Sequence, residues 1–225
     1  MTSAHPHRAP ARSIAIFGGT FDPIHSGHLT VAQAAQRRFH LDAIYFTPSS
    51  RPPHKSKQEL APFIHRYTMV ALACADHSGF IASLAEAPDG SGSHVFYSID
   101  TVRKFRREHP HDHMYFILGA DQFLEIPTWR HYEALLDSCD FIIASRPGFR
   151  LDALRLVIPP EALGRAGSHD SHKIALKRTA VHLLSTVHSH VSSTEVRQRL
   201  HARQPIHSLV PARVEEYIQG QALYR

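Results

Sequence analysis

The chain has 225 residues, of which 43% are hydrophobic, and this is enough for one α/β domain with a well-packed core. Its formal net charge of +5 at pH 7 favours anionic ligands. Because the Lys and Arg residues are spread along the chain, this charge predicts no nucleic-acid partner.

Neither the apolar residues nor the cysteines indicate a membrane or secreted protein. No apolar run approaches the length of a membrane span, so we expect no membrane partner. Cys74 and Cys139 form no CxxC pair and are expected to be reduced, buried thiols of a cytoplasmic protein. Residues 1–12 lack the apolar segment of a secretory signal, and we predict a disordered tail there, followed by a single domain over residues 13–225.

Short apolar runs alternate with amphipathic segments, which is typical of βαβ units. This order predicts an α/β fold: a doubly wound parallel sheet with helices on both faces and a small C-terminal helical portion. The expected strands are Ser13–Phe17, Ala43–Thr47, Phe80–Leu84, Met114–Leu118, Phe141–Ala144 and Ala180–Leu184. The expected helices are Ser26–Phe39, Pro62–Ala75, Tyr97–Glu108, His131–Leu136, Ser193–His201 and Pro211–Gln219. Leu151–Arg178 has a Pro-Pro break and little periodicity, so we expect it to leave the sheet.

The first predicted strand runs into the segment FGGTFDPIHSGHL, residues 17–29, and the first predicted helix begins inside it. In an open α/β sheet this position faces the ligand crevice, where free N–H groups at the helix start favour an anion. His25 and His28 are three residues apart, so one helical turn can place both rings on one side. Two glycines alone are often only a tight turn, but the order strand, GGTFDP, HxGH and helix indicates a polyphosphate site.

Four shorter motifs follow in the loops after later strands. Lys55 lies in PPHK, Asp121 in GAD, Trp129 in PTW and Arg146 in SRPG. Each has an ordinary structural explanation when taken alone: a solvated lysine, a helix cap, core packing and a simple turn. The carboxylate of Asp121 could equally accept hydrogen bonds from ribose hydroxyls.

A second phosphate motif, VSSTEVR, covers residues 191–197 near the C-terminus. Ser192, Ser193 and Thr194 can cap a helix while their hydroxyls and amides face an anion. Arg197 follows one turn later and can form a forked contact with phosphate oxygens. Capping alone would explain Ser-Ser-Thr, but together with the HxGH segment the motif indicates a second phosphate contact.

Twenty histidines raise the question of a metal site. Most of them are scattered, and the groups at residues 109–113 and 182–190 lack Cys or Glu partners at the spacing of a structural zinc site. We therefore predict no metal held by protein side chains.

In their order, these motifs resemble the bacterial nicotinate-nucleotide adenylyltransferases, a family of HxGH nucleotidyltransferases. The resemblance spans residues 13–225 and rests on GGTFDPIHSGH, PPHK, GAD, PTW, SRPG, SSTEVR and the closing GQALYR. It implies a Rossmann-like fold with one nucleotidyltransferase domain. The implied substrates are ATP and nicotinate mononucleotide, and the implied products are deamido-NAD and pyrophosphate.

The resemblance also implies roles for individual residues. His25, His28 and Arg197 would be catalytic. The ATP contacts would be Gly18, Gly19, Thr20, Phe21, His25, His28, Gly119, Asp121, Ser193, Thr194 and Arg197. The mononucleotide contacts would be Lys55, Tyr97, Thr101, Trp129 and Arg146, with Trp129 stacked on the pyridine ring. The segment Phe96-Tyr97-Ser98 departs from the Ser-Tyr-Thr of the family, which leaves the choice between nicotinate and nicotinamide less certain than the chemistry.

The implied nucleophile is a phosphate oxygen that is already anionic, so the reaction needs no general base. Mg²⁺ would enter with ATP, held mainly by phosphate oxygens and water. Three alternatives stay open: an enzyme for nicotinamide mononucleotide or for both nucleotides, a phosphopantetheine adenylyltransferase, and a non-catalytic nucleotide-binding module. The oligomeric state is also open, and a homo-oligomer is compatible with the sequence.

Overall fold

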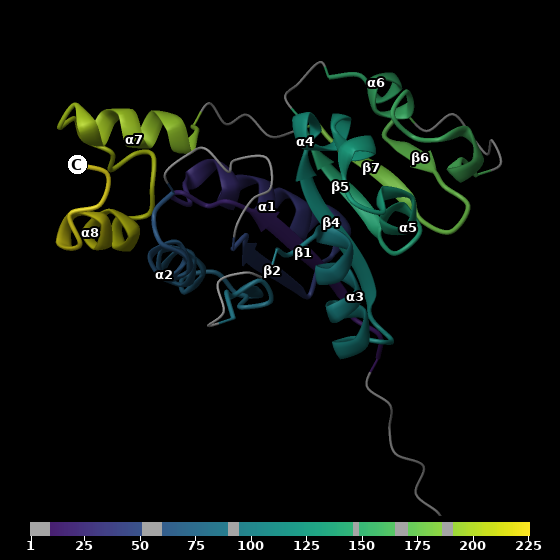
Figure 1. Ribbon diagram of the computed structural model, residues 1–225, viewed down its shortest axis with the longest axis horizontal. Helices are drawn as coiled ribbons and strands as arrows, with labels where there is room; N and C mark the ends of the chain where they lie inside the picture. Colours follow the sequence, from purple (N-terminus) through teal and green to yellow (C-terminus); the bar gives the residue numbers. More distant parts are fainter. Residues whose placement is uncertain (1–9, 51–59, 90–94, 146–148, 165–170, 186–190) are drawn as a thin grey trace, which may run out of the picture.

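The computed structural model describes residues 10–50, 60–89, 95–145, 149–164, 171–185 and 191–225. Within these ranges, seven strands form one sheet in the order β3-β2-β1-β4-β5-β7-β6 (Figure 1). The parallel strands are β1 (Ser13–Gly19), β2 (Ala43–Pro48), β3 (Phe80–Ala82), β4 (His113–Gly119), β5 (Asp140–Ala144) and β7 (Ala180–Leu184). At one edge, β6 (Lys173–Ala175) runs antiparallel to β7. The predicted doubly wound α/β fold is thereby confirmed.

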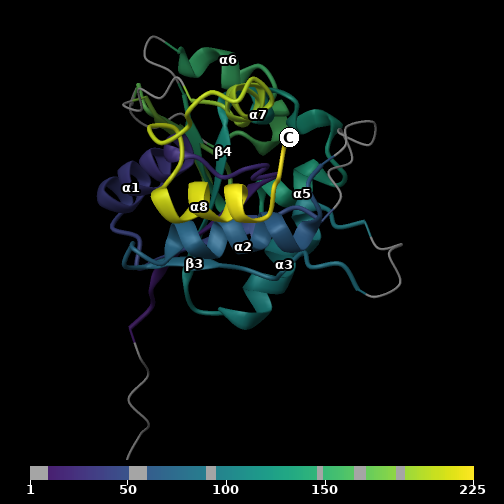
Figure 2. The same ribbon diagram turned by 90° about the vertical axis from the view of Figure 1, so that its left-hand side faces the viewer.

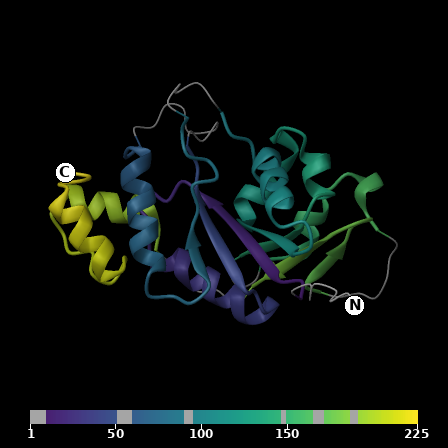
Figure 3. The same ribbon diagram turned by 90° about the horizontal axis from the view of Figure 1, so that it is seen from below.

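Helices cover both faces of this sheet, as Figures 1 and 3 show. One face carries α1 (Ser26–Phe39), α2 (Phe63–Cys74), α7 (Ser193–His201) and α8 (Ala212–Gly220). The other face carries α3 (Ser98–Glu108), α4 (Ala120–Leu124), α5 (Tyr132–Leu136) and α6 (Leu151–Arg155). Two 3₁₀ turns, η2 (Ile126–Thr128) and η3 (Pro160–Ala162), complete the described elements.

The central strand β1 shows why the core has two halves. Successive strand side chains point to opposite faces of a sheet. Accordingly, Ala15 and Phe17 belong to the apolar cluster under α1 and α2, whereas Ile14 and Ile16 belong to the cluster under α3. All four side chains are buried, as expected for a parallel strand that is covered on both faces.

The predicted bounds of the strands and helices agree with the structure to within two residues. The interpretation of Leu151–Arg178 as a segment outside the sheet was wrong, because it contains α6 and the edge strand β6. Of the three residues of β6 only Ile174 is buried, which is too short a pattern to recognise as alternation. The helix α4 was also missed, because its five residues are too few to show a helical period.

The N-terminal tail that we predicted over residues 1–12 lies mostly outside the described residues. Arg12 is an exception, because it continues the pairing of β1 with β4. Its guanidinium forms an ion pair of 2.9 Å with Asp112, and its carbonyl accepts a hydrogen bond of 2.7 Å from the backbone N–H of His113. Across the described ranges, no helix combines the length and the apolar character that crossing a bilayer requires.

The order of the strands places a crevice between β1 and β4. From β1 the chain moves outward to β2 and β3, and it then returns to β4 on the other side of β1. In a doubly wound sheet, ligands bind beyond the carboxyl ends of the strands where this reversal occurs. Those ends carry Gly18 and Gly19 on β1 and Gly119 on β4. The helices α7 and α8 form the small C-terminal portion, in which α8 lies alongside α2 (Figure 2).

Candidate active site

The turn between β1 and α1 has a backbone that most residues avoid. Phe21 adopts a φ of 50°, in the left-handed region, and its ring folds back over Gly19. A Cβ atom on Gly19 would lie 2.9 Å from Cζ of that ring, so any larger residue would force the buried Phe21 ring to move. Strained backbone of this kind is typical of functional sites. The turn is therefore a candidate functional segment.

His25 and His28 lie side by side at the start of α1, as the sequence predicts. Their rings stack with centroids 3.7 Å apart. Burial lowers the pKa of His25 to about 4, and burial together with His25 lowers the pKa of His28 well below its usual range. Both rings are therefore neutral at pH 7. The backbone N–H of His25 donates to Nδ1 of His28 at 3.2 Å, which leaves the proton of the His28 ring on Nε2.

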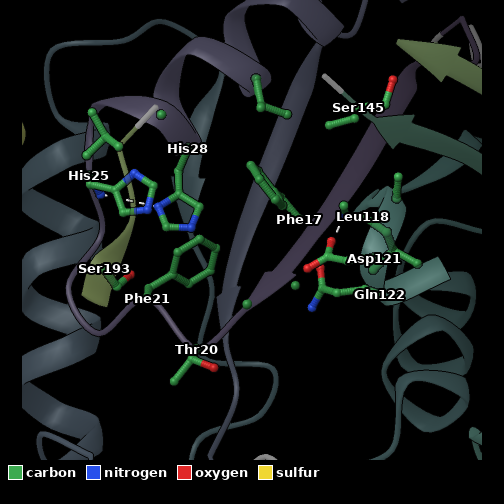
Figure 4. Close-up of a pocket in the computed structure, with 18 of the residues that line it drawn as sticks. Phe17, Thr20, Phe21, His25, His28, Leu118, Asp121, Gln122, Ser145 and Ser193 are labelled. Atoms are coloured by element: carbon green, nitrogen blue, oxygen red, sulfur yellow. Dashed lines mark hydrogen bonds between the residues drawn. The ribbon is translucent and has the colours of Figure 1, made fainter. Parts of the chain in front are cut away.

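A cavity of about 660 Å³ opens between these histidines and the end of β4. Figure 4 shows His25, His28 and Phe21 on one side of it and Asp121 and Gln122 on the other. The predicted ATP contacts that line the cavity are Gly18, Gly19, Thr20, Phe21, His25, His28, Gly119, Asp121 and Ser193. The cavity therefore brings together nine of the eleven residues predicted to contact ATP.

Asp121 and Gln122 come from the first turn of α4. The side-chain oxygen of Gln122 accepts a hydrogen bond of 3.2 Å from the backbone N–H of Gly119. A side chain at Gly119 would overlap the Asp121 carboxylate, so this glycine lets the carboxylate fold over the end of β4. The carboxylate is exposed to the cavity, where it can accept hydrogen bonds from hydroxyl groups.

A second cavity of about 760 Å³ adjoins the first. The two share the wall formed by Gly18, Gly19, Thr20, Leu118, Asp121 and Gln122. The second cavity is also lined by Tyr97 and Trp129, and the Arg130 guanidinium lies 4.6 Å from the centre of the Tyr97 ring. The indole Nε1 of Trp129 is buried and, within the described part of the chain, has no hydrogen-bond partner.

Glu86, which the sequence analysis did not single out, lies in the wall of the second cavity. Its carboxyl group is buried, and burial raises its pKa to about 7. The hydroxyl of Thr101 donates to its Oε1 at 2.7 Å. Thr101 is itself buried and does not line either cavity. The structure therefore places Thr101 behind the wall, as the partner of Glu86.

The Ser-Ser-Thr segment forms the start of α7, as predicted. The Ser192 hydroxyl caps the helix by accepting a hydrogen bond of 3.1 Å from the backbone N–H of Glu195. Ser193 reaches the first cavity, and its hydroxyl donates to the carbonyl of Pro23 at 2.9 Å. Thr194 is exposed and Arg197 is half-buried, and neither lines the described cavities. Arg197 instead donates to the carbonyl of Asp22 at 2.6 Å.

Two predicted mononucleotide contacts, Lys55 and Arg146, lie outside the described residues. Other cavity residues went unnoticed at the sequence level. Gln122 and Arg130 could have been found by extending the GAD and PTW motifs by one residue, and Ser145 is the first residue of SRPG itself. A lone carboxyl such as Glu86, in a loop without a motif, offers no such signal. Within the described ranges, His, Cys, Asp and Glu side chains form no group of three or more that could hold a metal ion.

Comparison with known proteins identifies the family of the chain. The profile of the cytidylyltransferase-like family matches residues 16–199. The chain is 43% identical to a protein of Moorella thermoacetica, covering 94% of this chain and 91% of that one. It is 39% identical to a protein of Geobacter sp., covering 94% and 97%. Both relatives bear the name "Probable nicotinate-nucleotide adenylyltransferase".

Among solved structures, the fold is similar to that of the Plasmodium falciparum nicotinic acid mononucleotide adenylyltransferase complexed with NaAD. The TM-score is 0.70 at 21% identity, with 95% of this chain and 97% of that chain covered. A nicotinate-nucleotide adenylyltransferase from Vibrio parahaemolyticus, described as putative, matches with a TM-score of 0.61 at 17% identity, over 95% and 96% of the two chains. At these identities the similarity establishes the fold.

Proposed function

The chain belongs to the nicotinate-nucleotide adenylyltransferase family, within the cytidylyltransferase-like nucleotidyltransferases, and we propose that it transfers AMP from ATP to nicotinate mononucleotide. The products are nicotinate adenine dinucleotide and pyrophosphate, so the enzyme acts in NAD biosynthesis.

One observation carries this proposal: two cavities of nucleotide size meet at a common wall. The first contains the histidine pair and the start of α7, which suit the phosphates of ATP. The second contains Tyr97 and Trp129, which suit a pyridine ring. The shared wall includes Thr20 and Asp121, and here the phosphate of one substrate can approach the α-phosphorus of the other.

The reaction is an in-line substitution at phosphorus. A phosphate oxygen of the mononucleotide forms a new bond to the α-phosphorus of ATP, and the bond between that phosphorus and the bridging oxygen breaks. The bridging oxygen keeps the electron pair and leaves with pyrophosphate. Because the nucleophile is already anionic, the protein contributes orientation and stabilisation of charge.

The neutral histidines suit this task as hydrogen-bond donors. The Nε2–H group of His28 can donate to a phosphate oxygen, since Nδ1 is occupied by the backbone of His25. An anionic ligand also raises the pKa of nearby imidazoles, so the bound phosphates favour protonation of the pair. We propose His25, His28 and Arg197 as the groups that stabilise the developing negative charge.

Mg²⁺ enters this reaction as part of the MgATP substrate. The first cavity offers one described carboxylate, that of Asp121, among neutral donors and apolar side chains. This set of groups is suited to a nucleotide whose phosphates bind the metal ion themselves.

The test is an assay of the purified protein with MgATP and nicotinate mononucleotide. We expect stoichiometric release of pyrophosphate and formation of the dinucleotide, and neither product when the mononucleotide is omitted. Replacing the mononucleotide with phosphopantetheine should give no pyrophosphate. Binding of MgATP without turnover would instead support a non-catalytic nucleotide-binding module.

We further propose that nicotinate is preferred over nicotinamide. The helix α3 begins at Ser98 in the wall of the second cavity, and helix N-termini favour a carboxylate. The expected result is a kcat/KM at least tenfold higher for nicotinate mononucleotide, on the principle that a site built for a polar group rejects the analogue that lacks it. Equal values would identify a dual-specificity enzyme. A single catalytic domain over residues 13–225, a cytoplasmic location and a homo-oligomeric state stay predictions.

A further inference from the structure

The closing GQALYR segment of the chain has no part in the proposed reaction, yet it reaches the phosphate turn. Asp22 lies in that turn, and its side chain is 2% exposed. The Tyr224 hydroxyl donates to Oδ1 of Asp22 at 2.6 Å, across 202 positions of sequence. The last turn of the chain is therefore bonded to the turn that carries the histidine pair.

Hydrogen bonds and apolar packing hold the C-terminal segment in place, so that Tyr224 can position Asp22. The backbone N–H groups of Ala222 and Leu223 donate to carbonyls of α8 at 3.2 and 3.1 Å. The side chains of Leu223 and Tyr224 pack against the apolar cluster under α1 and α2, and Figure 1 shows the C-terminus beside α7 and α8. Tyr224 adopts a φ of 61°, which a tyrosine rarely does without such support.

Asp22 joins two further segments to this contact, the residues before α2 and the helix α7. Its Oδ1 also accepts a hydrogen bond of 3.2 Å from the backbone N–H of Ala61, just before α2. Its carbonyl accepts the bond from Nη1 of Arg197 on α7. Among the residues that the structure describes, the second carboxylate oxygen, Oδ2, is buried without a hydrogen-bond partner, and it lies 3.9 Å from the same Nη1 atom. A buried oxygen left without a donor is costly, so the carboxylate has a strong tendency to take another donor.

Tyr224 and Arg197 thus lie against one carboxylate: the Tyr224 hydroxyl donates to Oδ1, and Nη1 of Arg197 lies 3.9 Å from Oδ2. Burial and the adjacent Asp22 raise the pKa of Tyr224 far above its usual range, so its hydroxyl keeps its proton and donates. While this bond is present, Arg197 is held on the Asp22 carbonyl and is 20% exposed. Without the hydroxyl, we expect the carboxylate to draw the Arg197 guanidinium into a close ion pair, in which it is less available to bound phosphates.

We propose that Tyr224 is a positioning residue for ATP: through Asp22 it fixes the phosphate turn and keeps Arg197 available to the nucleotide phosphates. This inference rests on the proposed function in one respect, namely that MgATP is the ligand of the first cavity.

The first test compares two variants that each lose one tyrosine hydroxyl. Tyr224→Phe removes the donor to Asp22. Tyr217→Phe is the matched control on α8, whose hydroxyl lies 2.9 Å from Nδ1 of His65. We expect Tyr224→Phe to lower kcat/KM for ATP about tenfold or more, as for a lost hydrogen bond to a charged group. In Tyr224→Phe, the KM for nicotinate mononucleotide should change by less than about twofold. In the control Tyr217→Phe, both kcat/KM for ATP and this KM should equal the wild-type values.

Measuring the Tm of both variants distinguishes a positioning role of Tyr224 from a loss of folded protein. Both variants should lower Tm by similar amounts. The proposal is overturned if Tyr224→Phe has the kinetics of Tyr217→Phe, or if it reduces kcat/KM equally for both substrates.

A double-mutant cycle tests whether Tyr224 acts through Asp22. In an Asp22→Ala background, Tyr224→Phe should cause no further loss, because the acceptor is already absent. Additive losses would overturn the pathway through Asp22. If Asp22→Ala does not fold, Asp22→Asn replaces it. There the charge that attracts Arg197 is absent, and Tyr224→Phe should change kcat/KM for ATP less than about twofold.

Calorimetric titration with MgATP alone separates this inference from the proposed reaction. If the wild type binds MgATP but forms no dinucleotide, the proposed reaction is wrong. In that case, weaker MgATP binding by Tyr224→Phe still supports the positioning role, whereas unchanged binding overturns it. If the wild type does not bind MgATP, both proposals are overturned.

Discussion

At the scale of single residues, His28 is the group with the best-defined role. Its ring is uncharged, its Nδ1 is occupied by the backbone of His25, and its remaining N–H is free to meet an anion. We expect His28→Ala to lower kcat by a factor of about 10²–10³, which is typical for loss of one donor to developing charge. Steady-state kinetics measure this, with His201→Ala, an exposed position on α7, as the control. Near-normal kcat in a folded His28→Ala variant would contradict the assignment.

Trp129 offers an optical test of the second cavity, because it is the only tryptophan of the chain. Its half-buried indole lines this cavity and not the first one. If the indole stacks on the pyridine ring, nicotinate mononucleotide should quench its fluorescence saturably, while MgATP should change it much less. Stacking is worth about 0.5–1.5 kcal/mol, so Trp129→Ala should raise the KM for the mononucleotide by several-fold or more. If the fluorescence does not change at mononucleotide concentrations that support turnover, Trp129 packs in the core and does not stack on the pyridine ring.

Glu86 should make mononucleotide binding depend on pH. Its pKa is raised to about 7 by burial, so the carboxyl loses its proton as the pH rises through neutrality. Among the described residues, the other charged side chains that line this cavity are Asp121, Glu125 and Arg130. An anionic substrate stabilises the neutral form of Glu86, and binding therefore weakens as the pH rises from 6 to 8.5.

The comparison with Glu86→Gln isolates this effect from the titration of the substrate phosphate. We expect the KM for nicotinate mononucleotide to rise several-fold over this pH range in the wild type and to rise less in Glu86→Gln. Steady-state kinetics at matched ionic strength measure both. Parallel pH profiles would show that Glu86 does not face the bound substrate.

At the scale of elements, α7 depends on its cap. The helix has nine residues, and Val196 is its only fully buried side chain, so little packing supports its first turn. Ser192→Ala removes the hydroxyl that accepts from Glu195, and we expect the free energy of unfolding to fall by about 1 kcal/mol. Urea denaturation measures this, with exposed Gln198→Ala as the control on the same helix. Equal effects of the two substitutions would show that the cap contributes nothing measurable.

At the scale of the whole molecule, the candidate site lies where the two halves of the sheet meet, at the pairing of β1 with β4. Asp121 stands in the wall that both cavities share, whereas Glu125 lines only the second. We therefore expect Asp121→Asn to raise the KM for both substrates, by about tenfold for a lost hydrogen bond to a charged acceptor. Glu125→Gln should leave the KM for ATP unchanged. An effect of Asp121→Asn on one substrate alone would mean that the two ligands do not meet at this wall.

Local sequence patterns predict this fold most closely. The helix over Ser26–Phe39 and the strand over Ala180–Leu184 have the bounds that were predicted. Their apolar spacing depends only on residues two to four positions apart. The same pattern failed over Leu151–Arg178, because a three-residue edge strand such as β6 is stabilised by its pairing with β7 and not by its own composition.

Sequence alone thus determined the alternation of strands and helices, the histidine pair at the start of α1, and the family to which the chain belongs. Only the tertiary structure decided which of these segments meet. It places β1 next to β4, so that GGTFDP and GAD face one another, and it bonds Tyr224 to Asp22. It also buries Glu86 in the wall of the cavity that Trp129 lines. The physical reason is that local periodicity reports which face of an element is apolar, whereas contacts between distant segments depend on how all those faces pack at once.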